Sequence, residues 1–399
     1  DVTAAAAGAS YNDKNVAGAN AVGYTGLALR GAAADNYSLA ATTAQGTGSI
    51  TKRTLTASAV GAQTKTYDGT TAADASQFRA TLNNVVTGEE NSVTATAAGA
   101  AYNDKNVAGA NRIDYTGVAL TGTGAGNYAV ADTAQGAGTI TQRALTLGAV
   151  ESQTKTYDGT RAADASQFRA ALNNVVAGDN VTAAAAGAAY NDKNVAAANR
   201  IDYTGVGLAG ADAGNYSLAA TTAQSAGTIT RRTLTVDTVA AQTKTYDGTR
   251  AADASQFRAA LAGAIAGDSV AAAATGAAYN DKNVAAANRI DYTGVALAGA
   301  DAGNYSLAAT TAQGAGTITK RTLTVDTVAA QSKTYDGSVS ADAGKFSATL
   351  GNTIAGDSVT AIAADAAYNS KDVAAANAVN YTGVALGGSD AGNYTLAAT

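Results

Sequence analysis

The feature that most constrains this chain is an internal repeat of about 89 residues. Four aromatic markers recur in a fixed order, Tyr-Asp-Gly, Tyr-Asn, Tyr-Thr-Gly and Asn-Tyr, and together they contain all 19 tyrosines. The tyrosines of the four series are Tyr67, Tyr157, Tyr246 and Tyr335; Tyr11, Tyr102, Tyr190, Tyr279 and Tyr368; Tyr24, Tyr115, Tyr203, Tyr292 and Tyr381; and Tyr37, Tyr128, Tyr216, Tyr305 and Tyr394. The four phenylalanines keep the same spacing, so no aromatic residue indicates a site unique to one copy.

The length of the repeat predicts a row of small domains. Solenoid units have about 20 to 50 residues, whereas a unit of this size can fold around its own core. The predicted segments are residues 1–52, which form the C-terminal part of a repeat; the repeats 53–142, 143–231 and 232–320; and 321–399, a repeat without its last strand. Asp1 aligns with Asn180. We therefore expect the two ends to be cuts in a longer array, or their missing strands to come from neighbouring chains.

Short polar pairs mark the predicted boundaries between repeats. Before Lys320 the apolar position is even, at Ile318, and after it the positions are odd, at Leu323 and Val325. Because side chains alternate along a strand, the buried face must switch at the pair. The boundaries are Lys52/Arg53, Gln142/Arg143, Arg231/Arg232 and Lys320/Arg321. A linker of almost no length favours a stiff rod over flexibly tethered domains.

The strand pattern predicts a mainly β fold, a tandem array of immunoglobulin-like β-sandwich domains. Thr, Val, Ile and Tyr alternate with small residues, and turn residues follow about every eight to twelve positions. The segments Asp212–Tyr216 and Asp301–Tyr305 resemble the corner of such sandwiches, where a tyrosine hydroxyl bonds to nearby backbone. Ala33 and Gly124 replace the Asp in two copies, so the corner would depend on the tyrosine.

The alternative fold is a β-grasp-like repeat with one short helix. Residues Asp253–Leu261 offer a capping aspartate and two apolar residues four positions apart, Phe257 and Leu261. The same segment is also compatible with an edge strand.

Composition excludes several function classes. The chain has no His and no Cys, which removes the usual zinc ligands, the Ser-His-Asp triad and thiol chemistry. The formal net charge is −5, so no nucleic-acid partner is expected, and no run of about 20 apolar residues predicts membrane insertion. We expect no enzyme activity, no cofactor and no metal site. The absence of Cys fits either a cytosolic or an exported chain.

The Lys-Thr-Tyr-Asp-Gly segment, Lys65–Gly69 in the first complete repeat, is a candidate for chemistry. A carboxylate next to a tyrosine can act as an acid or a base, and a lysine can form an isopeptide bond with a buried Asn, as Lys155 or Lys14 would have to do. The simpler interpretation is a strand that ends in an Asp-Gly turn, in which Gly takes a positive φ. We predict the turn.

Two further groups of oxygen ligands are candidates for a functional site. Tyr102–Asn106 could suggest calcium, but in the last copy Ser370 replaces the Asp and Asp372 replaces the Asn, so a hydrogen-bonded turn is predicted instead. Paired carboxylates could suggest glycoside hydrolysis. The acids that persist beside glycines are the Asp of Tyr-Asp-Gly and a second series, Glu89, Asp179, Asp268 and Asp357. Catalysis is not expected at either series.

Six motifs in fixed order carry a family resemblance: Lys-Thr-Tyr-Asp-Gly-Thr, Val-Ala-Gly-Asp-x-Val, Asp-Lys-Asn-Val-Ala, Tyr-Thr-Gly-Val-x-Leu, Asp-Ala-Gly-Asn-Tyr-Ser-Leu and Gly-Thr-Ile-Thr-x-Arg-x-Leu-Thr. They resemble the YDG/MBG-type repeats of very large bacterial surface adhesins, many of them filamentous haemagglutinin-like and exported by two-partner secretion. The resemblance implies stalk or fibre modules. It departs at the Ile-Thr-x junction, where Lys, Gln or Arg stands in place of the Pro that the family often has.

The leading hypothesis is a non-enzymatic, extracellular structural region on the cell surface, which forms a stiff stalk or fibre of a bacterial adhesin or surface filament. Each repeat is expected to be self-contained, with its tyrosines bonded internally. One alternative is a multivalent glycan-binding array, which needs exposed tyrosine rings. Another is a filament subunit joined by strand complementation. The expected partners are other copies of the chain or neighbouring fibre chains, and in the first alternative host or surface glycans.

Overall fold

The computed structural model describes residues 1–397, so the last two residues of the predicted final repeat lie outside the described part. The chain divides into two compact units. The first comprises residues 1–151, 164–188 and 203–224, and the second comprises 152–163, 189–202 and the chain from 225 onward. Repeat 53–142 lies wholly in the first unit and repeat 232–320 wholly in the second, so each unit is described through one complete repeat.

Every described copy is built from short strands. The partial copy has β1 Thr3–Ala5, β2 Gly8–Tyr11, β3 Ala21–Thr25, β4 Ala28–Arg30 and β5 Thr43–Thr47. Repeat 53–142 has β6 Arg53–Thr54, β7 Thr56–Ser58, β8 Gln63–Thr66, β9 Thr81–Asn83, β10 Thr94–Thr96, β11 Gly99–Tyr102, β12 Arg112–Thr116, β13 Ala119–Thr121, β14 Tyr128–Ala129 and β15 Thr133–Thr141. Repeat 143–231 has β16 Arg143–Val150, β17 Gln153–Thr156, β18 Ala170–Asn173, β19 Thr182–Ala184, β20 Gly187–Tyr190, β21 Arg200–Thr204, β22 Gly207–Ala209, β23 Tyr216–Leu218 and β24 Thr222–Thr230.

The second half of the chain repeats the pattern. Repeat 232–320 has β25 Arg232–Val239, β26 Gln242–Thr245, β27 Ala259–Ala262, β28 Ala271–Ala273, β29 Gly276–Tyr279, β30 Arg289–Thr293, β31 Ala296–Ala298, β32 Tyr305–Leu307 and β33 Thr311–Thr319. The last copy has β34 Arg321–Val328, β35 Ala348–Gly351, β36 Thr360–Ile362, β37 Asp365–Tyr368, β38 Val379–Thr382, β39 Ala385–Gly387 and β40 Tyr394–Leu396. The mainly β fold with four repeating domains of 85 to 90 residues is therefore confirmed.

Helical structure within residues 1–397 is limited to three-residue 3-10 turns. They are η1 Ala34–Asn36, η2 Ala75–Gln77, η3 Ala125–Asn127, η4 Ala165–Gln167, η5 Ala213–Asn215, η6 Ala254–Gln256, η7 Ala302–Asn304, η8 Ala343–Lys345 and η9 Ala391–Asn393. Residues Asp253–Leu261, for which the sequence leaves a short helix and an edge strand open, form one 3-10 turn followed by the edge strand β27. Asp253 does cap a turn, because its side chain accepts from the Ser255 N–H. The chain then enters β27, where Leu261 pairs with Val236 of β25. Pairing with a neighbouring strand therefore overrides the local helix signal.

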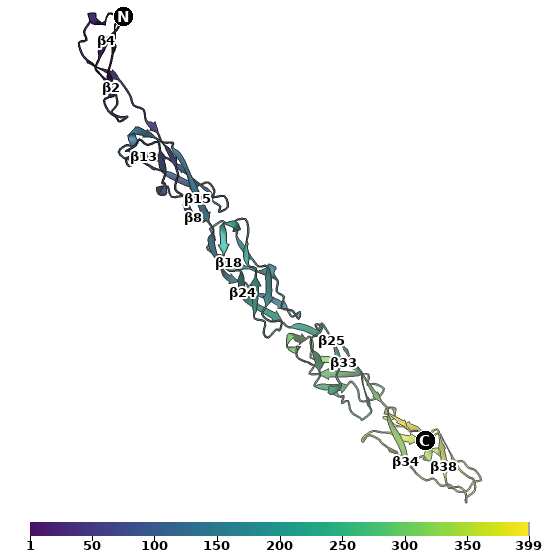
Figure 1. The fold of residues 1–399 in the computed structure, drawn as a ribbon. Helices are drawn as coiled ribbons and strands as arrows, with labels where there is room; N and C mark the ends of the chain where they lie inside the picture. Colours follow the sequence, from purple (N-terminus) through teal and green to yellow (C-terminus); the bar gives the residue numbers. More distant parts are fainter. Residues whose placement is uncertain (398–399) are drawn as a thin grey trace. The chain divides into compact units, whose positions relative to one another are not determined.

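Each complete repeat contains a four-stranded mixed sheet, which we call its body. In repeat 53–142 the body has the order β8-β15-β12-β11, and in repeat 232–320 the order β26-β33-β30-β29. The first pair of each sheet is parallel, and Figure 1 shows β8 beside β15 in the first unit. The other pairs are antiparallel.

The strand that begins each repeat belongs to a smaller group of strands, which we call the base. In repeat 143–231 the base is β16 between β18 and β23, together with the pair β19–β22. In repeat 232–320 it is β25 between β27 and β32, together with β28–β31. One residue separates the body of one repeat from the base of the next: β15 ends at Thr141 and β16 begins at Arg143.

The buried face switches at this break, as the sequence predicts. In β33 the even-numbered Ile318 is 1% exposed, and in β34 the odd-numbered Leu323 is 0% exposed. The predicted ends of the repeats themselves stay a prediction.

The hydrophobic core does not stop at the break. In the first unit, Tyr67, Ile113 and Ile140 of one repeat form a single cluster with Leu145 and Tyr216, which belong to the base of the next. In the second unit, Tyr246 and Ile318 likewise share a cluster with Leu323 and Tyr394. By contrast, the base of repeat 53–142 forms a separate cluster, Leu55, Val93 and Tyr128. A body therefore packs with the following base, and the expectation of self-contained repeats is not met.

Candidate functional site

The recurring polar site of the chain lies where a body meets the following base. In the first unit, the Tyr67 hydroxyl donates to Asp179 Oδ2 at 2.9 Å, and the Tyr216 hydroxyl donates to the same oxygen at 2.5 Å. The Tyr216 oxygen also accepts from the Val176 N–H at 3.0 Å. Two tyrosines, one from each repeat, therefore share one carboxylate oxygen. We call this arrangement the tyrosine–carboxylate junction.

Local structure places each of these groups. The turn that carries Asp179 closes through the Asp179 N–H and the Val176 carbonyl, and Gly178 takes a φ of 94° within it. This turn wraps around the Tyr216 hydroxyl, which bonds to both of its ends. The rings of Tyr67 and Tyr216 meet edge to face, with centroids 5.3 Å apart, a favourable arrangement for aromatic pairs.

The Gly of Tyr-Asp-Gly is required by both its conformation and its neighbour. Gly69 has a φ of 79°, which other residues rarely adopt. A Cβ on Gly69 would also lie 2.9 Å from Val176 Cγ1 of the next repeat. The motif is therefore shaped for the contact between repeats as well as for its own turn.

A second contact involves the Asn of Asn-Tyr. Asn215 Oδ1 accepts from the Val107 N–H at 2.9 Å, and Asn215 Nδ2 donates to Asn106 Oδ1 at 2.9 Å. Asn215 is only 5% exposed, so these bonds satisfy an amide that would otherwise be buried without partners. In addition, Gln142, the residue between the two strands, donates to the Gly214 carbonyl at 3.1 Å.

The second unit contains the same junction twice. Tyr157 and Tyr305 share Asp268 Oδ2 at 2.8 and 2.5 Å, and Tyr246 and Tyr394 share Asp357 Oδ2 at the same distances. The amide contact recurs as Asn304 with Val195 and Asn194, and as Asn393 with Val284 and Asn283. The geometry is therefore a property of the repeat and not of one position.

Burial and the hydrogen bond to the carboxylate act together on the pKa of the tyrosine. Burial, followed by the hydrogen bond to Asp179, raises the pKa of Tyr67 well above its ordinary value. The pKa values of Tyr157 and Tyr246 are raised by the same causes, through Asp268 and Asp357. A phenol with a raised pKa keeps its proton near neutral pH, so Tyr67 remains a hydrogen-bond donor to the carboxylate of Asp179.

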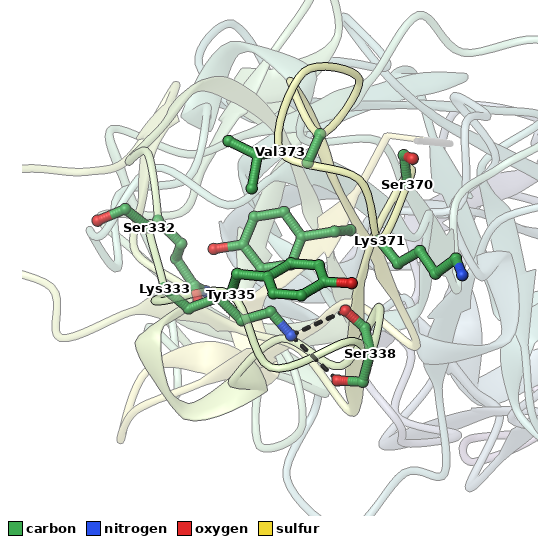
Figure 2. Close-up of a pocket in the computed structure, with 10 residues that line it drawn as sticks. Ser332, Lys333, Tyr335, Ser338, Ser370, Lys371 and Val373 are labelled. Carbon is green, nitrogen blue, oxygen red and sulfur yellow. Dashed lines mark hydrogen bonds between the residues drawn. The ribbon is translucent and has the colours of Figure 1, made fainter.

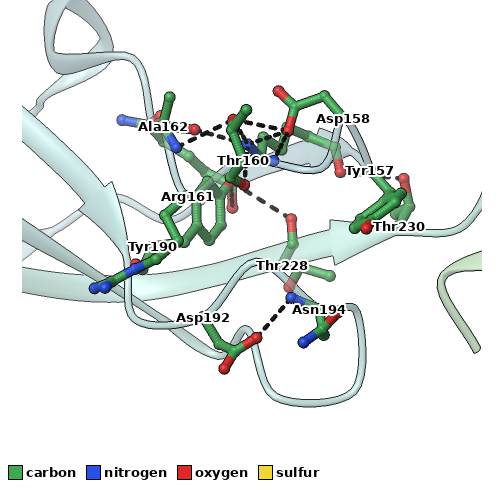
Figure 3. Close-up of polar contacts among 12 residues, drawn as sticks. Tyr157, Asp158, Thr160, Arg161, Ala162, Tyr190, Asp192, Asn194, Thr228 and Thr230 are labelled. Atoms are coloured by element: carbon green, nitrogen blue, oxygen red, sulfur yellow. Dashed lines mark hydrogen bonds and ion pairs between the residues drawn. The ribbon is translucent and has the colours of Figure 1, made fainter. Parts of the chain in front are cut away.

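The predicted Asp-Gly turn is present. Asp158 Oδ1 accepts from the Thr160 N–H at 2.9 Å, and Gly159 has a φ of 77° (Figure 3). Burial raises the pKa of Asp158, but bonds from Lys155 and Thr160 outweigh it and hold that pKa below its ordinary value. The Lys155 amine donates to Asp158, to Thr160 and to the Ala162 carbonyl, and it lies 5.3 Å from the centre of the Tyr190 ring.

An isopeptide bond is not supported by these contacts. No Asn is among the groups that the Lys155 amine bonds. The other candidate, Lys14, is an exposed side chain 4.0 Å from the carboxylate of Glu89. The half-buried Lys155 instead bonds within the turn that precedes the contact of Tyr157 with the next repeat.

The segment weighed as a calcium site is a turn that bonds to itself. Asp104 Oδ1 accepts from the N–H of Asn106 at 2.7 Å and from its Nδ2 at 3.0 Å. The same Asp–Asn contact recurs at Asp192 and Asn194 (Figure 3). Within residues 1–397 no group of three or more His, Cys, Asp or Glu is placed to hold a metal ion. The turn also positions Asn106 for the following repeat.

The predicted tyrosine corner needs correction. The Tyr216 hydroxyl does bond to backbone, but it accepts from the N–H of Val176, which lies 40 residues earlier. The same hydroxyl donates to the carboxylate of Asp179. Asp212 has a different role, since its Oδ2 accepts from the Asn180 N–H at 2.8 Å. Of the two acid series considered for glycoside hydrolysis, the Asp of Tyr-Asp-Gly bonds within its own turn, and Asp179, Asp268 and Asp357 each bond two tyrosines. The sequence signal for the junction is that Tyr-Asp-Gly and the acid series recur together, which associates the two motifs but does not say which copy of one contacts which copy of the other.

In the last repeat, the surface around the tyrosine of Tyr-Asp-Gly is exposed. Tyr335 is 61% exposed and Val373 is 78% exposed. Both residues line a hollow beside Lys333 and Ser338, which are hydrogen-bonded to each other (Figure 2). In repeat 53–142 the corresponding surface is covered by the repeat's own last strand, β15, and by the following base.

Two comparisons with known proteins add no functional assignment. The search of curated proteins found no significant match. Among solved structures, the chain is similar to the protocadherin GammaB4 extracellular domain, at 12% identity and a TM-score of 0.27, with 80% of this chain and 61% of that chain covered. It is also similar to the human desmocollin-1 ectodomain, at 7% identity and a TM-score of 0.21, with 86% and 76% covered. Such low TM-scores carry no conclusion about this chain.

No helix within residues 1–397 is long and apolar enough to cross a membrane. The model of the YDG domain family matches the chain four times, at residues 51–135, 141–223, 230–312 and 319–399. These matches cover each of the Tyr-Asp-Gly motifs and most of the chain. The chain therefore belongs to the YDG domain family, as four tandem copies of that domain.

Proposed function

We propose that this chain is a non-enzymatic, extracellular structural region that forms a stiff stalk or fibre of a bacterial surface adhesin or surface filament. The observation that carries the proposal is the tyrosine–carboxylate junction, in which repeat after repeat is bonded to the next through one carboxylate oxygen. The resemblance of the six motifs to adhesin repeats supports the placement on a cell surface. The proposed partners are neighbouring copies or fibre chains.

Stiffness follows from how the junction is built. One residue connects the strands of adjoining repeats, and the cores on either side form a single cluster. Bending would have to break hydrogen bonds to an ionised group, each of which contributes about 1.5–3 kcal/mol, and would also expose buried apolar surface. Two such contacts, at Asp179 and at Asn215, restrain rotation as well as bending.

The complete repeats do not favour the glycan-binding alternative. A sugar platform needs exposed rings, whereas Tyr67, Tyr102, Tyr115 and Tyr128 are at most 3% exposed. The exposed tyrosines of the chain, such as Tyr37 and Tyr335, belong to incomplete copies.

The experiment that tests the proposal measures how rigid one junction is. Because the chain has no Cys, spin labels can be attached to single introduced cysteines, one in the body of repeat 53–142 (Thr116→Cys) and one in the base of the next (Ala209→Cys). We expect a narrow distribution of label-to-label distances. Asp179→Ala should broaden it, because two buried hydroxyls lose their acceptor, while Asp179→Asn, which keeps an acceptor oxygen, should retain most of the narrowness.

The matched control is Glu151→Ala, an exposed acid of the same base with no role in the junction. It should leave the distribution unchanged. A broad distribution in the unmodified junction would refute the stiff stalk, whatever the variants do.

A further inference from the structure

The topology sets two parallel strand pairs between the points where tension enters and leaves a repeat. In repeat 232–320 the chain enters through β25 and leaves through β33. β25 pairs in parallel with β32, from Arg232↔Tyr305 to Leu234↔Leu307. β26, which directly follows β25, pairs in parallel with β33, from Gln242↔Gly316 to Thr245↔Thr319. The first strands of the repeat are thus fastened to its last ones.

The direction of pulling then decides how these pairs break. Tension on the chain draws β26 toward its N-terminal end and draws β33 toward its C-terminal end. In a parallel pair these pulls run along the strands in opposite directions, so the evenly spaced ladder bonds are stretched together. A pull across the pair would instead break the bonds one after another. Shear requires the larger force because several bonds must fail at once.

Further contacts continue the β26–β33 pair past its last register position. The Tyr246 N–H donates to the Thr319 carbonyl at 2.9 Å, and the Thr319 hydroxyl donates to the Lys244 carbonyl at 3.3 Å. Ile318 at the centre of the pair is 1% exposed, which keeps water from replacing the broken bonds. In the base, the Ala308 N–H donates to the Leu234 carbonyl at 2.9 Å, and Leu234 is fully buried.

Repeat 53–142 contains the same device in the first unit. β8 pairs in parallel with β15, from Gln63↔Gly138 to Thr66↔Thr141, and the Tyr67 N–H donates to the Thr141 carbonyl at 2.9 Å. β6 pairs in parallel with β14 over two residues. The two parallel strand pairs are therefore present in both of these complete repeats.

We propose that each complete repeat is a mechanical clamp, which resists tension through shear of its parallel strand pairs. This activity is separate from the stiffness proposed above, since a stiff junction can join weak repeats and a flexible junction can join strong ones. The clamps act in series along the chain, so the repeat with the weakest clamp opens first under tension.

The test pulls the same folded repeat in two directions. The full chain carries two introduced cysteines as the only attachment points for a single-molecule force measurement. One variant combines Thr233→Cys with Lys320→Cys, so that the pull runs along the pairs. The other combines Thr245→Cys with Lys320→Cys, which lie side by side at the C-terminal ends of β26 and β33, so that the pull runs across the pair. All three sites are exposed.

We expect the rupture force in the first variant to be severalfold higher than in the second, at equal loading rate. Both variants keep every ladder bond, so a difference reports direction alone. Equal forces, or a lower force along the pairs, would overturn the proposal. Circular dichroism of both variants before attachment checks that the fold is kept, and rupture lengths corresponding to about 87 and 75 released residues, at roughly 3.5 Å each, identify the repeat that opened.

A second measurement uses a difference already present in the chain. The last repeat has the pair β34–β40 in its base, but residues 331–334 form no strand. Pulled from the two ends of the chain, this repeat should open at a lower force than the complete repeats. If it opens at the same force, the β26–β33 type of pair is not the clamp. The two proposals can fail separately. If the rupture force along the pairs is high but the label-to-label distance distribution at the junction is broad, the stiff stalk is refuted and the mechanical clamp is not.

Discussion

Tyr67 and Tyr335 are the same residue of the repeat in two settings. Tyr67 is 0% exposed and bonded to Asp179 of the next repeat, whereas Tyr335 is 61% exposed and lines an open hollow. Their local sequences, Lys-Thr-Tyr-Asp-Gly, are identical, and both aspartates bond to a lysine three residues earlier. Local sequence therefore builds the turn, and the following strand and repeat bury the tyrosine. The two settings allow the contribution of the junction to be measured within one molecule.

The largest difference is expected from truncating the two tyrosines. Tyr67→Ala removes a fully buried ring that packs on Tyr216, and should cost about 3–5 kcal/mol of local unfolding free energy. Tyr335→Ala removes a mostly exposed ring and should change that free energy by no more than about 0.5 kcal/mol. Amide hydrogen exchange in β8 and β16 measures the first effect. Similar costs at the two positions would mean that burial at the junction is not what stabilises it.

A smaller difference is expected when only the hydroxyl is removed. Tyr67→Phe keeps the ring but loses the hydrogen bond to the carboxylate of Asp179, which should cost about 1.5–3 kcal/mol. Tyr335→Phe removes a hydroxyl for which the described chain offers no junction acid, so it should be close to neutral. Exchange of the Val176 amide, which bonds to the Tyr216 hydroxyl beside Asp179, is the local readout. An unchanged exchange rate in Tyr67→Phe would show that the shared carboxylate contributes nothing.

The fold was predictable because its signals are local. Alternation with period two predicts the strands and places the switch of buried face between Ile318 and Leu323, since both depend only on nearby residues. The sequence left a short helix and an edge strand open over Asp253–Leu261, because local signals cannot weigh a cap and an apolar pair against the strand pairing of Leu261 with Val236. The β-rich class needed no knowledge of which repeat contacts which.

The junction could not be predicted for a reason specific to repeats. Tyr67 and Asp179 lie 112 residues apart. In a periodic sequence, Tyr67 could equally be assigned to the acid of its own repeat, Glu89. The tyrosine and the acid recur with the same period, so the sequence fits either pairing. Glu89 instead accepts from the hydroxyl of Tyr128, in its own base, at 2.6 Å. Only the three-dimensional packing of a body with the following base distinguishes the two assignments.

An effect of intermediate size is expected when the asparagine of the Asn-Tyr motif is replaced. Asn304 is 4% exposed and bonds to Val195 and Asn194, whereas the equivalent Asn36 of the partial copy is exposed. Asn304→Ala leaves the Val195 N–H without its partner and should cost about 1–2 kcal/mol. Asn36→Ala should cost almost nothing. Exchange at the Val195 amide measures the effect, and equal costs for the two substitutions would remove the amide contact from the junction.

Ionisation of the junction tyrosines should have the smallest effect on the stability of the junction near neutral pH. This effect should grow only at alkaline pH. Burial and the bond to Asp179 raise the pKa of Tyr67 above its ordinary value near 10, so the folded junction favours the neutral phenol. Below about pH 10 the phenol is protonated in both the folded and the unfolded state, and its contribution to stability is fully present. Above that pH the unfolded state loses its proton first, and the contribution falls as the pH rises toward the folded pKa.

The distance distribution between labels at Thr116→Cys and Ala209→Cys should therefore stay narrow up to about pH 10 and broaden above it. Tyr67→Phe should weaken this dependence at that junction, because the phenylalanine ring has no proton to lose. If the distribution broadens equally with and without Tyr67→Phe, the alkaline transition arises from other buried tyrosines and not from the shared carboxylate.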